Sequence, residues 1–274
     1  MPELPEVETV VRGLAQRVTG DIVESVWLSG KPQSLKSPAR EIARTLERAR
    51  IEKIHRQGKH IVFELSRQPS AVSHQKKHSQ FIVHLGMTGS LVVAQPDLPV
   101  AKHTHAILKL GSGRELRFVD PRRFGRLSVH TDRRFEGVEP FDVGLEAFRS
   151  LFRRRKTPIK SALLNQKLLR GIGNIYADES LFRAGIRPRR RAASLTGDEL
   201  QRLYRAIPEV LNEAIAAGGS SVSDYVDAAG EEGSFQLELQ VYGREGESCL
   251  VCRTAIKRVV VAGRSTHYCP KCQK

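Results

Sequence analysis

The first eight residues, Met1-Pro2-Glu3-Leu4-Pro5-Glu6-Val7-Glu8, combine a penultimate proline with three carboxylates. If Met1 is removed, Pro2 becomes an N-terminal secondary amine, and because an α-amino group titrates near pH ~8, a useful fraction is neutral and nucleophilic. Attack of this amine on a sugar C1′ would form an iminium that acts as an electron sink, with Glu3 beside it to move protons. The alternative is structural, because prolines and acids are favoured in the first turn of a helix. The octet alone leaves both interpretations open.

All four cysteines lie in the last 26 residues, as Cys249-x-x-Cys252 and, sixteen residues later, Cys269-x-x-Cys272. Two such pairs fit tetrahedral zinc held by two β-hairpins, whereas a disulfide framework would be spread over a secreted fold. Four thiolates leave no open coordination position, which predicts one structural zinc ion. Basic residues on the same segment, among them Arg264, would make it a DNA-binding arm.

Gly171-Ile172-Gly173-Asn174 stands directly before a predicted helix. Exposed backbone N–H groups at a helix N-terminus form an anion site, and Asn174 could add a side-chain donor. A tight turn between two helices would explain the glycines equally well. The anion site is favoured by neighbouring cations that would surround it, namely Lys156, Lys160 and Lys167.

Two further motifs, His84–Gly89 and Asp120–Gly125, lie between predicted strands. Met87 and Phe124 within them are either core residues or wedges that enter a base stack, and Arg122 could fill a vacated base position. Lys59 follows a glycine just before a strand, where an ordinary solvated lysine is the alternative.

The charge balance limits the partners. The chain has 274 residues, long enough for two or three domains, and carries 45 Lys and Arg against 30 Asp and Glu, a net charge of +15. Such an excess favours a polyanion, most simply nucleic acid. No apolar run approaches the ~18 residues that span a membrane, and no signal peptide opens the chain. We therefore expect a soluble, cytoplasmic protein without a membrane partner.

The first half of the chain must position Pro2 and Glu3. Val7, Val10, Val11, Leu14 and Val18 form one stripe of a helix over 5–20, which would hold the N-terminus on a rigid element. A strand at 21–29 follows, and then a helix at 38–49 with Ile42 and Leu46 inward. A polar loop at 66–79 lies among short apolar runs rich in Val, Ile, Leu and Phe, and Gly111-Ser112-Gly113 predicts a hairpin turn. These runs are 60–65, 81–85, 90–94, 105–110, 115–119 and 126–130, and they predict a β-sandwich with helices at its edge.

The second half changes character after a linker at 131–143. Helical patterns cover 144–153, 158–169, 174–184 and 196–217, and Thr196 begins a capping box. Pro208 should kink or interrupt the last helix. A Gly- and Ser-rich loop at 218–235 precedes a strand-like tail at 236–274 that carries the cysteines.

Taken together, several motifs resemble the formamidopyrimidine-DNA glycosylase family over nearly the whole chain: MPELPEVE, HLGMTGSL, DPRRFG, KTPIKSALLNQKLLRGIGNIYADESLFRAGIRP, QLELQVYGREGESC and GRSTHYCPKCQ. The resemblance implies an α+β fold that clamps duplex DNA. Its parts would be a catalytic β-sandwich domain with flanking helices at 1–134, a helix–two-turn–helix domain with a base-capping loop at 144–235, and a zinc finger of β-hairpins at 236–274.

The resemblance also implies a bifunctional enzyme that flips out an oxidised purine, such as 8-oxoguanine or a formamidopyrimidine, and cleaves the abasic site by β- and δ-elimination. Pro2 would form the Schiff base and Glu3 would move protons. Lys59 and Arg264 complete the implied catalytic set. The implied DNA-binding residues are His84, Met87, His103, Arg122, Phe124, Lys156 and Asn174.

The expected partner is damaged duplex DNA, bound by a bacterial-type, nucleoid-associated monomer. Two rival functions remain. The related endonuclease VIII type acts on oxidised pyrimidines and usually begins Pro-Glu-Gly-Pro, whereas this chain has Pro2-Glu3-Leu4-Pro5. A non-catalytic zinc-ribbon DNA-binding protein would fit the charge and the cysteines, but it would not need the Pro-Glu start.

Overall fold

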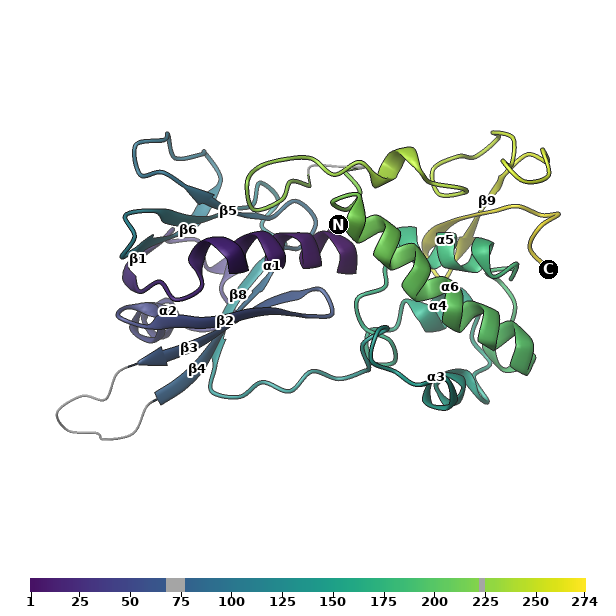
Figure 1. The fold of residues 1–274 in the computed structure, drawn as a ribbon, viewed down its shortest axis with the longest axis horizontal. Helices are drawn as coiled ribbons and strands as arrows, with labels where there is room; N and C mark the ends of the chain where they lie inside the picture. The colour runs from purple at the N-terminus through teal and green to yellow at the C-terminus, as the bar shows by residue number, and fades with distance from the viewer. Residues whose placement is uncertain (68–76, 222–224) are drawn as a thin grey trace. The chain divides into compact units, whose positions relative to one another are not determined.

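The computed structural model describes residues 1–67, 77–221 and 225–274. The chain divides into two compact units, one of residues 1–135 with 218–233 and the other of residues 136–217 with 234–274. The first unit contains the large β-sheets and the second contains most of the helices and the cysteines (Figure 1). Parts of the predicted loops at 66–79 and 218–235 lie outside the described residues.

Helix α1 (Leu4–Val18) confirms the predicted N-terminal helix. Its apolar stripe is buried, and the helix packs mainly on strand β2 (Arg50–Gln57) and also on β5 (Ser90–Ala94). Burial of one long face explains why this segment is helical despite its β-branched residues, because tertiary packing outweighs intrinsic propensity. The helix start is therefore part of the core of the first unit rather than a frayed terminus.

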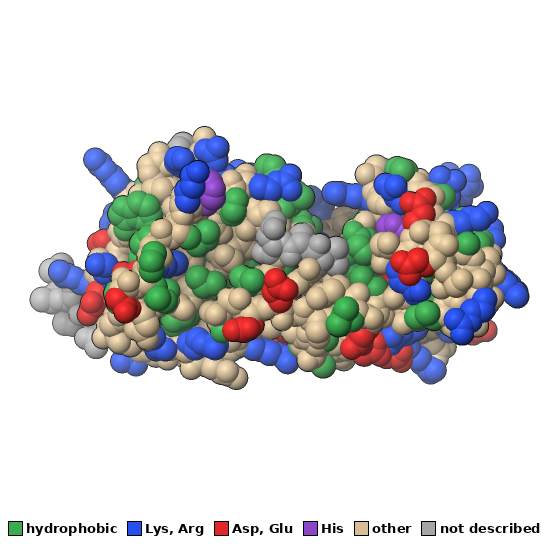
Figure 2. Space-filling model, turned by 90° about the horizontal axis from the view of Figure 1, so that it is seen from above, with side chains coloured by type: hydrophobic (Ala, Val, Ile, Leu, Met, Phe, Trp, Pro, Cys, Tyr) green, Lys and Arg blue, Asp and Glu red, His purple; other side chains and the backbone are tan. Residues whose placement is uncertain are grey.

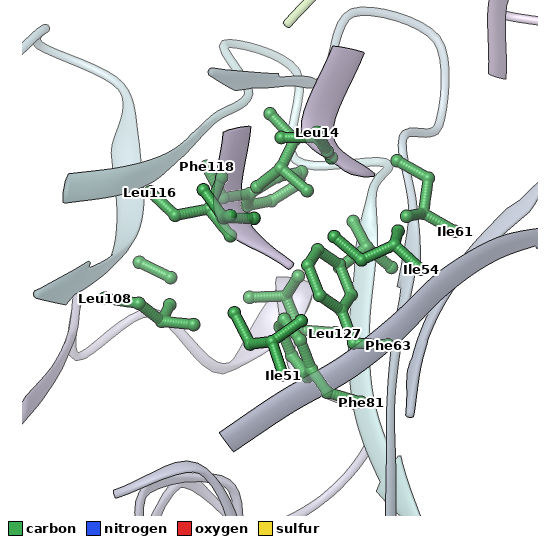
Figure 3. Close-up of a cluster of buried hydrophobic side chains, with 14 of the residues drawn as sticks. Leu14, Ile51, Ile54, Ile61, Phe63, Phe81, Leu108, Leu116, Phe118 and Leu127 are labelled. Atoms are coloured by element: carbon green, nitrogen blue, oxygen red, sulfur yellow. The ribbon is translucent and has the colours of Figure 1, made fainter. Parts of the chain in front are cut away.

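Two four-stranded antiparallel sheets form the predicted sandwich. One has the order β1 (Val23–Leu28), β6 (Thr104–Leu110), β7 (Glu115–Val119), β5; the other has the order β2, β3 (His60–Arg67), β4 (Lys77–His84), β8 (Arg126–His130). Their inward side chains, with Leu14 of α1, form a single apolar cluster that includes Phe63, Phe81 and Phe118 (Figure 3). Helix α2 (Ala39–Leu46) buries Ile42 and Leu46, as predicted, and a 3₁₀ turn, η1 (Pro32–Ser34), precedes it.

Tight turns hold neighbouring strands in register. The turn predicted at Gly111–Gly113 joins β6 to β7, where Gly113 has a φ of +81° and its N–H donates to the carbonyl of Leu110 over 2.8 Å. A second short turn joins β2 to β3 and includes Gly58, whose φ is +58°. Strand β2 itself was not predicted as a separate run, because its two buried residues, Ile51 and Ile54, are three positions apart across an irregularity in the register and do not alternate.

The second unit contains helices α3 (Leu145–Phe152), α4 (Ile159–Leu163), α5 (Asn174–Arg183) and α6 (Gly197–Ala216), with 3₁₀ turns η2 (Ala192–Ser194) and η3 (Phe235–Leu237). The helix predicted over 158–169 was too long. It ends at Leu163 because Gln166 leaves the helical path: its amide donates to the carbonyl of Ile172 and accepts from the N–H of Gly171. Hydrogen bonds of this kind, between a side chain and the nearby backbone, compete with helix formation.

Helix α6 is continuous from Gly197 to Ala216, so Pro208 does not interrupt it, and the alternative of a kink at Pro208 stays a prediction. Pro208 lacks the N–H for one helical hydrogen bond, and burial of the apolar face of the helix offsets this loss of stability. That face includes Leu203, Ile207 and Leu211. The capping box at Thr196 is confirmed.

The tail contains one hairpin of two strands and one shorter antiparallel turn. Strands β9 (Lys257–Val261) and β10 (Arg264–Tyr268) pair between the two Cys-x-x-Cys motifs, with Ala262 and Gly263 at positive φ in the turn. The first motif lies in a second antiparallel turn, bridged between Ser248 and Ala255, in which the N–H of Cys249 donates to the carbonyl of Thr254 over 2.9 Å.

Candidate active site and zinc centre

Glu3 and Glu6 fix the start of helix α1 through a reciprocal capping box. The backbone N–H of Glu3 donates to Glu6 Oε2 over 2.8 Å, and the Glu3 side chain accepts from the backbone of Glu6. Pro2 is buried and Glu3 is 3% exposed, so the dipeptide is held at the positive end of the helix dipole. With Met1 in place the Pro2 nitrogen belongs to a tertiary amide and has no nucleophilic lone pair.

The segment 218–233 belongs to the same unit as helix α1, and it is anchored on Glu6. The backbone N–H of Ser220 donates to Glu6 Oε1 over 2.8 Å, and the Tyr225 hydroxyl donates to the Glu6 carbonyl over 3.2 Å. Gly219 has a φ of +86°, and a Cβ there would lie 3.0 Å from Glu6 Cγ. Burial, followed by the negative charge of Glu6, raises the pKa of Tyr225, which keeps its hydroxyl a donor. Sequence reasoning gave no signal for this contact, which joins residues more than 200 positions apart.

Lys59 and His84 lie at neighbouring strand ends in the sheet β2–β3–β4–β8. Lys59 occupies the β2–β3 turn and is 7% exposed, and His84 is the last residue of β4. Burial, with the cations Lys59, Arg126 and Arg133, lowers the pKa of His84 to about 4. The N–H of Gly86 donates to His84 Nδ1 over 3.1 Å, so the neutral ring carries its proton on Nε2. His84 is therefore a neutral hydrogen-bond donor near pH 7.

The loops that carry Met87 and Phe124 interlock around Asp120. Thr88 Oγ1 donates to one carboxylate oxygen of Asp120 over 2.7 Å, and the N–H of Gly125 donates to the other over 2.7 Å. Gly86 has a φ of +71°, and a Cβ there would lie 2.5 Å from the backbone of both Phe124 and Gly125. Only glycine allows this approach at position 86, and Gly125 is restricted as well, because a Cβ there would lie 2.5 Å from the Phe118 ring.

Met87 and Phe124 are surface residues, 39% and 46% exposed, so neither fills the core. The Arg122 guanidinium lies 4.9 Å from the centre of the Phe124 ring, which aligns the two side chains. His103 is also exposed, and its carbonyl accepts from the N–H of Asp120 over 2.9 Å. The first unit thus brings these four residues onto two adjoining loops and the segment before β6.

In the second unit, Asn174 and Arg264 are joined through Ser265. Asn174 begins α5, and its Nδ2 donates to the carbonyl of Ser265 over 2.9 Å, while Arg264 is exposed at the start of β10. One amide hydrogen of Asn174 is thus committed to the protein, leaving the other for a ligand. Lys156 is exposed near this unit's α4.

Lys160 is not the surface cation that the sequence predicted. Its side chain is 0% exposed, and Nζ lies 2.7 Å from Asp178 Oδ1 and donates to the carbonyl of Ser265 and the hydroxyl of Thr266. Asp178 also accepts from the N–H of His267 over 2.9 Å. The residues next to Lys160 in the sequence gave no sign that its side chain is buried. Lys167 is 76% exposed and pairs with Glu136 at 3.0 Å.

The four cysteine thiols converge as the zinc prediction requires. Their Sγ atoms all lie within 4.8 Å of one another, with 3.4 Å between Cys252 and Cys269 and 3.9 Å between Cys249 and Cys272. Tetrahedral zinc with Zn–S bonds of about 2.3 Å places its sulfur ligands roughly 3.8 Å apart. The cysteines therefore fit one structural zinc ion, which fixes the turn and the hairpin that bears Arg264.

The surface is rich in positive charge. Figure 2 shows Lys and Arg side chains on many parts of one face, with fewer acidic side chains between them. Among the described residues, no helix is both long and apolar enough to cross a membrane.

The sandwich, the helical region and the four-cysteine centre together define an α+β zinc-finger protein. Three family models match it in order: the formamidopyrimidine-DNA glycosylase N-terminal domain over residues 1–127, the H2TH domain of that glycosylase over 137–226, and the zinc finger found in FPG and IleRS over 246–274. The chain therefore belongs to the formamidopyrimidine-DNA glycosylase family.

Individual relatives agree with the family models over the full chain. The formamidopyrimidine-DNA glycosylase of Solibacter usitatus is 47% identical over 100% of both chains. A mutant FPG of Lactococcus lactis, solved with Fapy-dG containing DNA, has a TM-score of 0.89 at 35% identity and 100% coverage of both chains. MutM in complex with DNA containing carbocyclic 8-oxo-G has a TM-score of 0.88 at 35% identity, again over 100% of both chains.

Proposed function

We propose that this chain excises oxidised purines from duplex DNA and then cleaves the abasic site through a Schiff base on Pro2. As a family member it is a base-excision DNA glycosylase and abasic-site lyase. The observation that carries the assignment of Pro2 is the buried Pro2-Glu3 dipeptide, fixed at the start of α1 by Glu6. A non-catalytic DNA-binding protein has no need to fix its second and third residues in this way.

The chemistry begins when removal of Met1 frees the secondary amine. The Pro2 nitrogen attacks C1′, the base leaves with a proton, and the opened sugar becomes an iminium. That cation acidifies the C2′ proton, whose removal expels the 3′ phosphate; a second elimination expels the 5′ phosphate. Glu3 is positioned by the helix start to move protons at the sugar. Hydrolysis of the iminium then returns the free amine.

The other site residues divide by their chemistry. Lys59, His84, Asn174 and Arg264 would bind phosphates around the damaged nucleotide, with Lys59 and Arg264 also in the catalytic set. His84 suits this role because its Nε2–H is a neutral donor. His103 and Lys156 would add contacts to the DNA backbone, in support of which both side chains are exposed.

Met87, Arg122 and Phe124 would occupy the hole that the flipped nucleotide leaves and wedge the opposite strand. Their exposure and the stacking of Arg122 on Phe124 support this role. Segment 218–233, anchored on Glu6, would close over the flipped base.

The division of the chain is also a proposal: a catalytic domain at 1–134, a helix–two-turn–helix domain at 144–235 and a zinc finger at 236–274. Residues 218–233 of the middle domain pack in the compact unit that contains the catalytic domain. In support, the family models match one part each. The protein would act as a monomer in a bacterial cytoplasm, associated with the nucleoid through its DNA substrate.

The deciding experiment is incision of an 8-oxoguanine·cytosine duplex, compared with duplexes that carry a formamidopyrimidine, an oxidised pyrimidine or no damage. We expect incision at the oxidised purines, with phosphates on both sides of a one-nucleotide gap. Faster incision at oxidised pyrimidines would favour the endonuclease VIII type, and binding without incision would favour a zinc-ribbon DNA-binding protein.

Phe124→Ala should lower recognition of damage while leaving the melting temperature nearly unchanged.

A further inference from the structure

The outer face of the sheet β2–β3–β4–β8 carries polar and cationic side chains. Side chains alternate between the two faces of a strand, so the burial of Leu127 and Val129 in the core places Arg126, Ser128 and His130 on the opposite face. The register continues this pattern across the sheet: His84 of β4 pairs with Arg126 of β8 and with His60 of β3. The rings of His60 and His84 are 4.9 Å apart.

These side chains line a groove of about 520 Å³. Arg126, His130 and Arg133 lie on its β8 side, and Phe124 and His84 also contribute to its lining. Lys36 reaches the groove from the segment before α2, which runs beside β8: the N–H of Lys36 donates to the carbonyl of Leu127 over 2.8 Å. The groove is therefore built entirely from the first unit.

Within the described part of the chain, Lys36, Arg126 and Arg133 form no ion pair with a carboxylate. Arg126 is held in place by carbonyls instead, because its Nη1 donates to those of Arg123 and Gly125. The Arg133 guanidinium lies 5.1 Å from the centre of the Phe135 ring.

The positive charge of the groove contributes to lower pKa values of its histidines His84 and His130. Burial and then Arg133 lower the pKa of His130, against an opposing effect of Glu41. Burial, Lys59, Arg126 and Arg133 lower the pKa of His84. Three cations that pair with no described carboxylate, two of them held in place by neighbouring groups, lie beside uncharged imidazole rings and form a site that favours an anion.

We propose that this groove binds the sugar–phosphate backbone of DNA beyond the damaged nucleotide, through Lys36, Arg126 and Arg133. The inference rests on the proposed function, because His84 and Phe124 line the groove and also belong to the proposed DNA-contacting set. A strand that leaves His84 along this face meets the three cations next. The groove thus lengthens the footprint of the enzyme on one side of the lesion, without a role in the chemistry.

The test compares the wild type with Lys36→Gln/Arg133→Gln, a variant that leaves Arg126 and the Phe124 loop in place. The control is Lys109→Gln, an exposed lysine of β6 in the other sheet. Affinity is measured against salt for a long duplex with a central abasic-site analogue and for two duplexes shortened on one side of it. Each lost phosphate contact should reduce the slope of log K against log [salt] by about 0.9 on duplex DNA.

We expect the double variant to lose close to two contacts on the long duplex and on one shortened duplex, and none on the other. Lys109→Gln should change no slope. An unchanged slope for the double variant on all three duplexes would overturn the proposal, as would an equal loss on all three. Saturable shifts of the His130 resonances with inorganic phosphate, together with unchanged salt slopes on all three duplexes, would instead indicate a site for a free anion and overturn the DNA assignment. Incision of lesions in the shortened duplexes by the wild type tests the proposed function separately.

Discussion

The backbone N–H of Ser220 donates to Glu6 Oε1 over 2.8 Å, while the other oxygen of the same carboxylate accepts from the N–H of Glu3. One side chain therefore joins the proposed base-capping segment to the residue beside the nucleophile. Closure of that segment and orientation of Glu3 share one carboxylate, so a change at Glu6 should affect both.

Glu6→Gln should separate base excision from lyase activity. A glutamine offers one acceptor oxygen for two buried N–H groups, and an unsatisfied buried donor costs about 1–3 kcal/mol. We expect the free energy of unfolding to fall by about that amount, and excision of 8-oxoguanine to fall more than cleavage of a preformed abasic site. The exposed Glu24 of β1 offers a control, Glu24→Gln, which should change neither quantity. Equal losses in both activities would show that Glu6 does not act through the capping segment.

Pro2 should form a covalent adduct with DNA only after Met1 is removed. Borohydride reduction during turnover should trap the iminium, and mass spectrometry should map the cross-link to residue 2. Pro2→Gly keeps a primary amine and should be impaired yet retain lyase activity. Glu3→Gln should lose excision more than cleavage of a preformed abasic site. An adduct on Lys59 or another lysine, with Pro2 unmodified, would overturn the assignment.

Zinc removal should weaken DNA binding because Arg264 lies on the hairpin between the two cysteine pairs. Metal analysis should find one zinc per chain, and Cys269→Ser should lower both zinc content and affinity. Arg264→Ala should weaken binding to all sequences alike and reduce the salt slope by about one contact. A zinc-free protein with full affinity, or an unchanged salt slope for Arg264→Ala, would contradict this prediction.

The sequence predicted the elements whose periodicity and spacing are local. The stripe of α1, the turn at Gly111–Gly113 and the cysteine spacing each specify structure within a few residues, and all three agree with the structure. The length of α4 was wrong because the Gln166 side chain provides alternative backbone partners. Pro208 does not interrupt α6, because packing of the buried face of this helix outweighs one lost hydrogen bond.

The contacts that were missed join residues far apart in the chain. Nothing near Lys160 in the sequence reveals Asp178, eighteen residues later, or the hairpin carbonyl of Ser265. The Glu6–Ser220 bond has the same character. The roles that the family resemblance implies for single residues stay predictions, because they depend on contacts with DNA.

His84 should remain neutral well below pH 6. Its pKa is lowered to about 4 from 6.5, so between these values the unfolded chain binds more protons than the folded one. Stability therefore rises with pH through this window and is lost as pH falls from about 6.5 toward 4. His84→Gln should reduce this loss, measured as the change in melting temperature between pH 7 and pH 5. Nitrogen NMR of the wild type should find the proton on Nε2; a ring that titrates near pH 6.5 would contradict the prediction.

The last prediction concerns the buried pair of Lys160 and Asp178, both 0% exposed. Lys160→Met would leave Asp178 buried without its cation, which typically costs about 3–5 kcal/mol. Function should suffer as well, since the carbonyl of Ser265 accepts from both Lys160 and Asn174 and directly follows Arg264. We expect lower stability and a weaker, flatter salt dependence of DNA binding.

Lys167→Met supplies the matched control, because Lys167 forms an exposed pair with Glu136 at 3.0 Å. Exposed pairs contribute about 0–1 kcal/mol, so this change should hardly alter the free energy of unfolding. The double change Lys160→Met/Asp178→Asn should recover part of the stability, since the amide oxygen can still accept from the N–H of His267 and no bare charge remains. If Lys160→Met and Lys167→Met have equal effects in denaturant titrations, the pair of Lys160 and Asp178 does not hold the hairpin against α5.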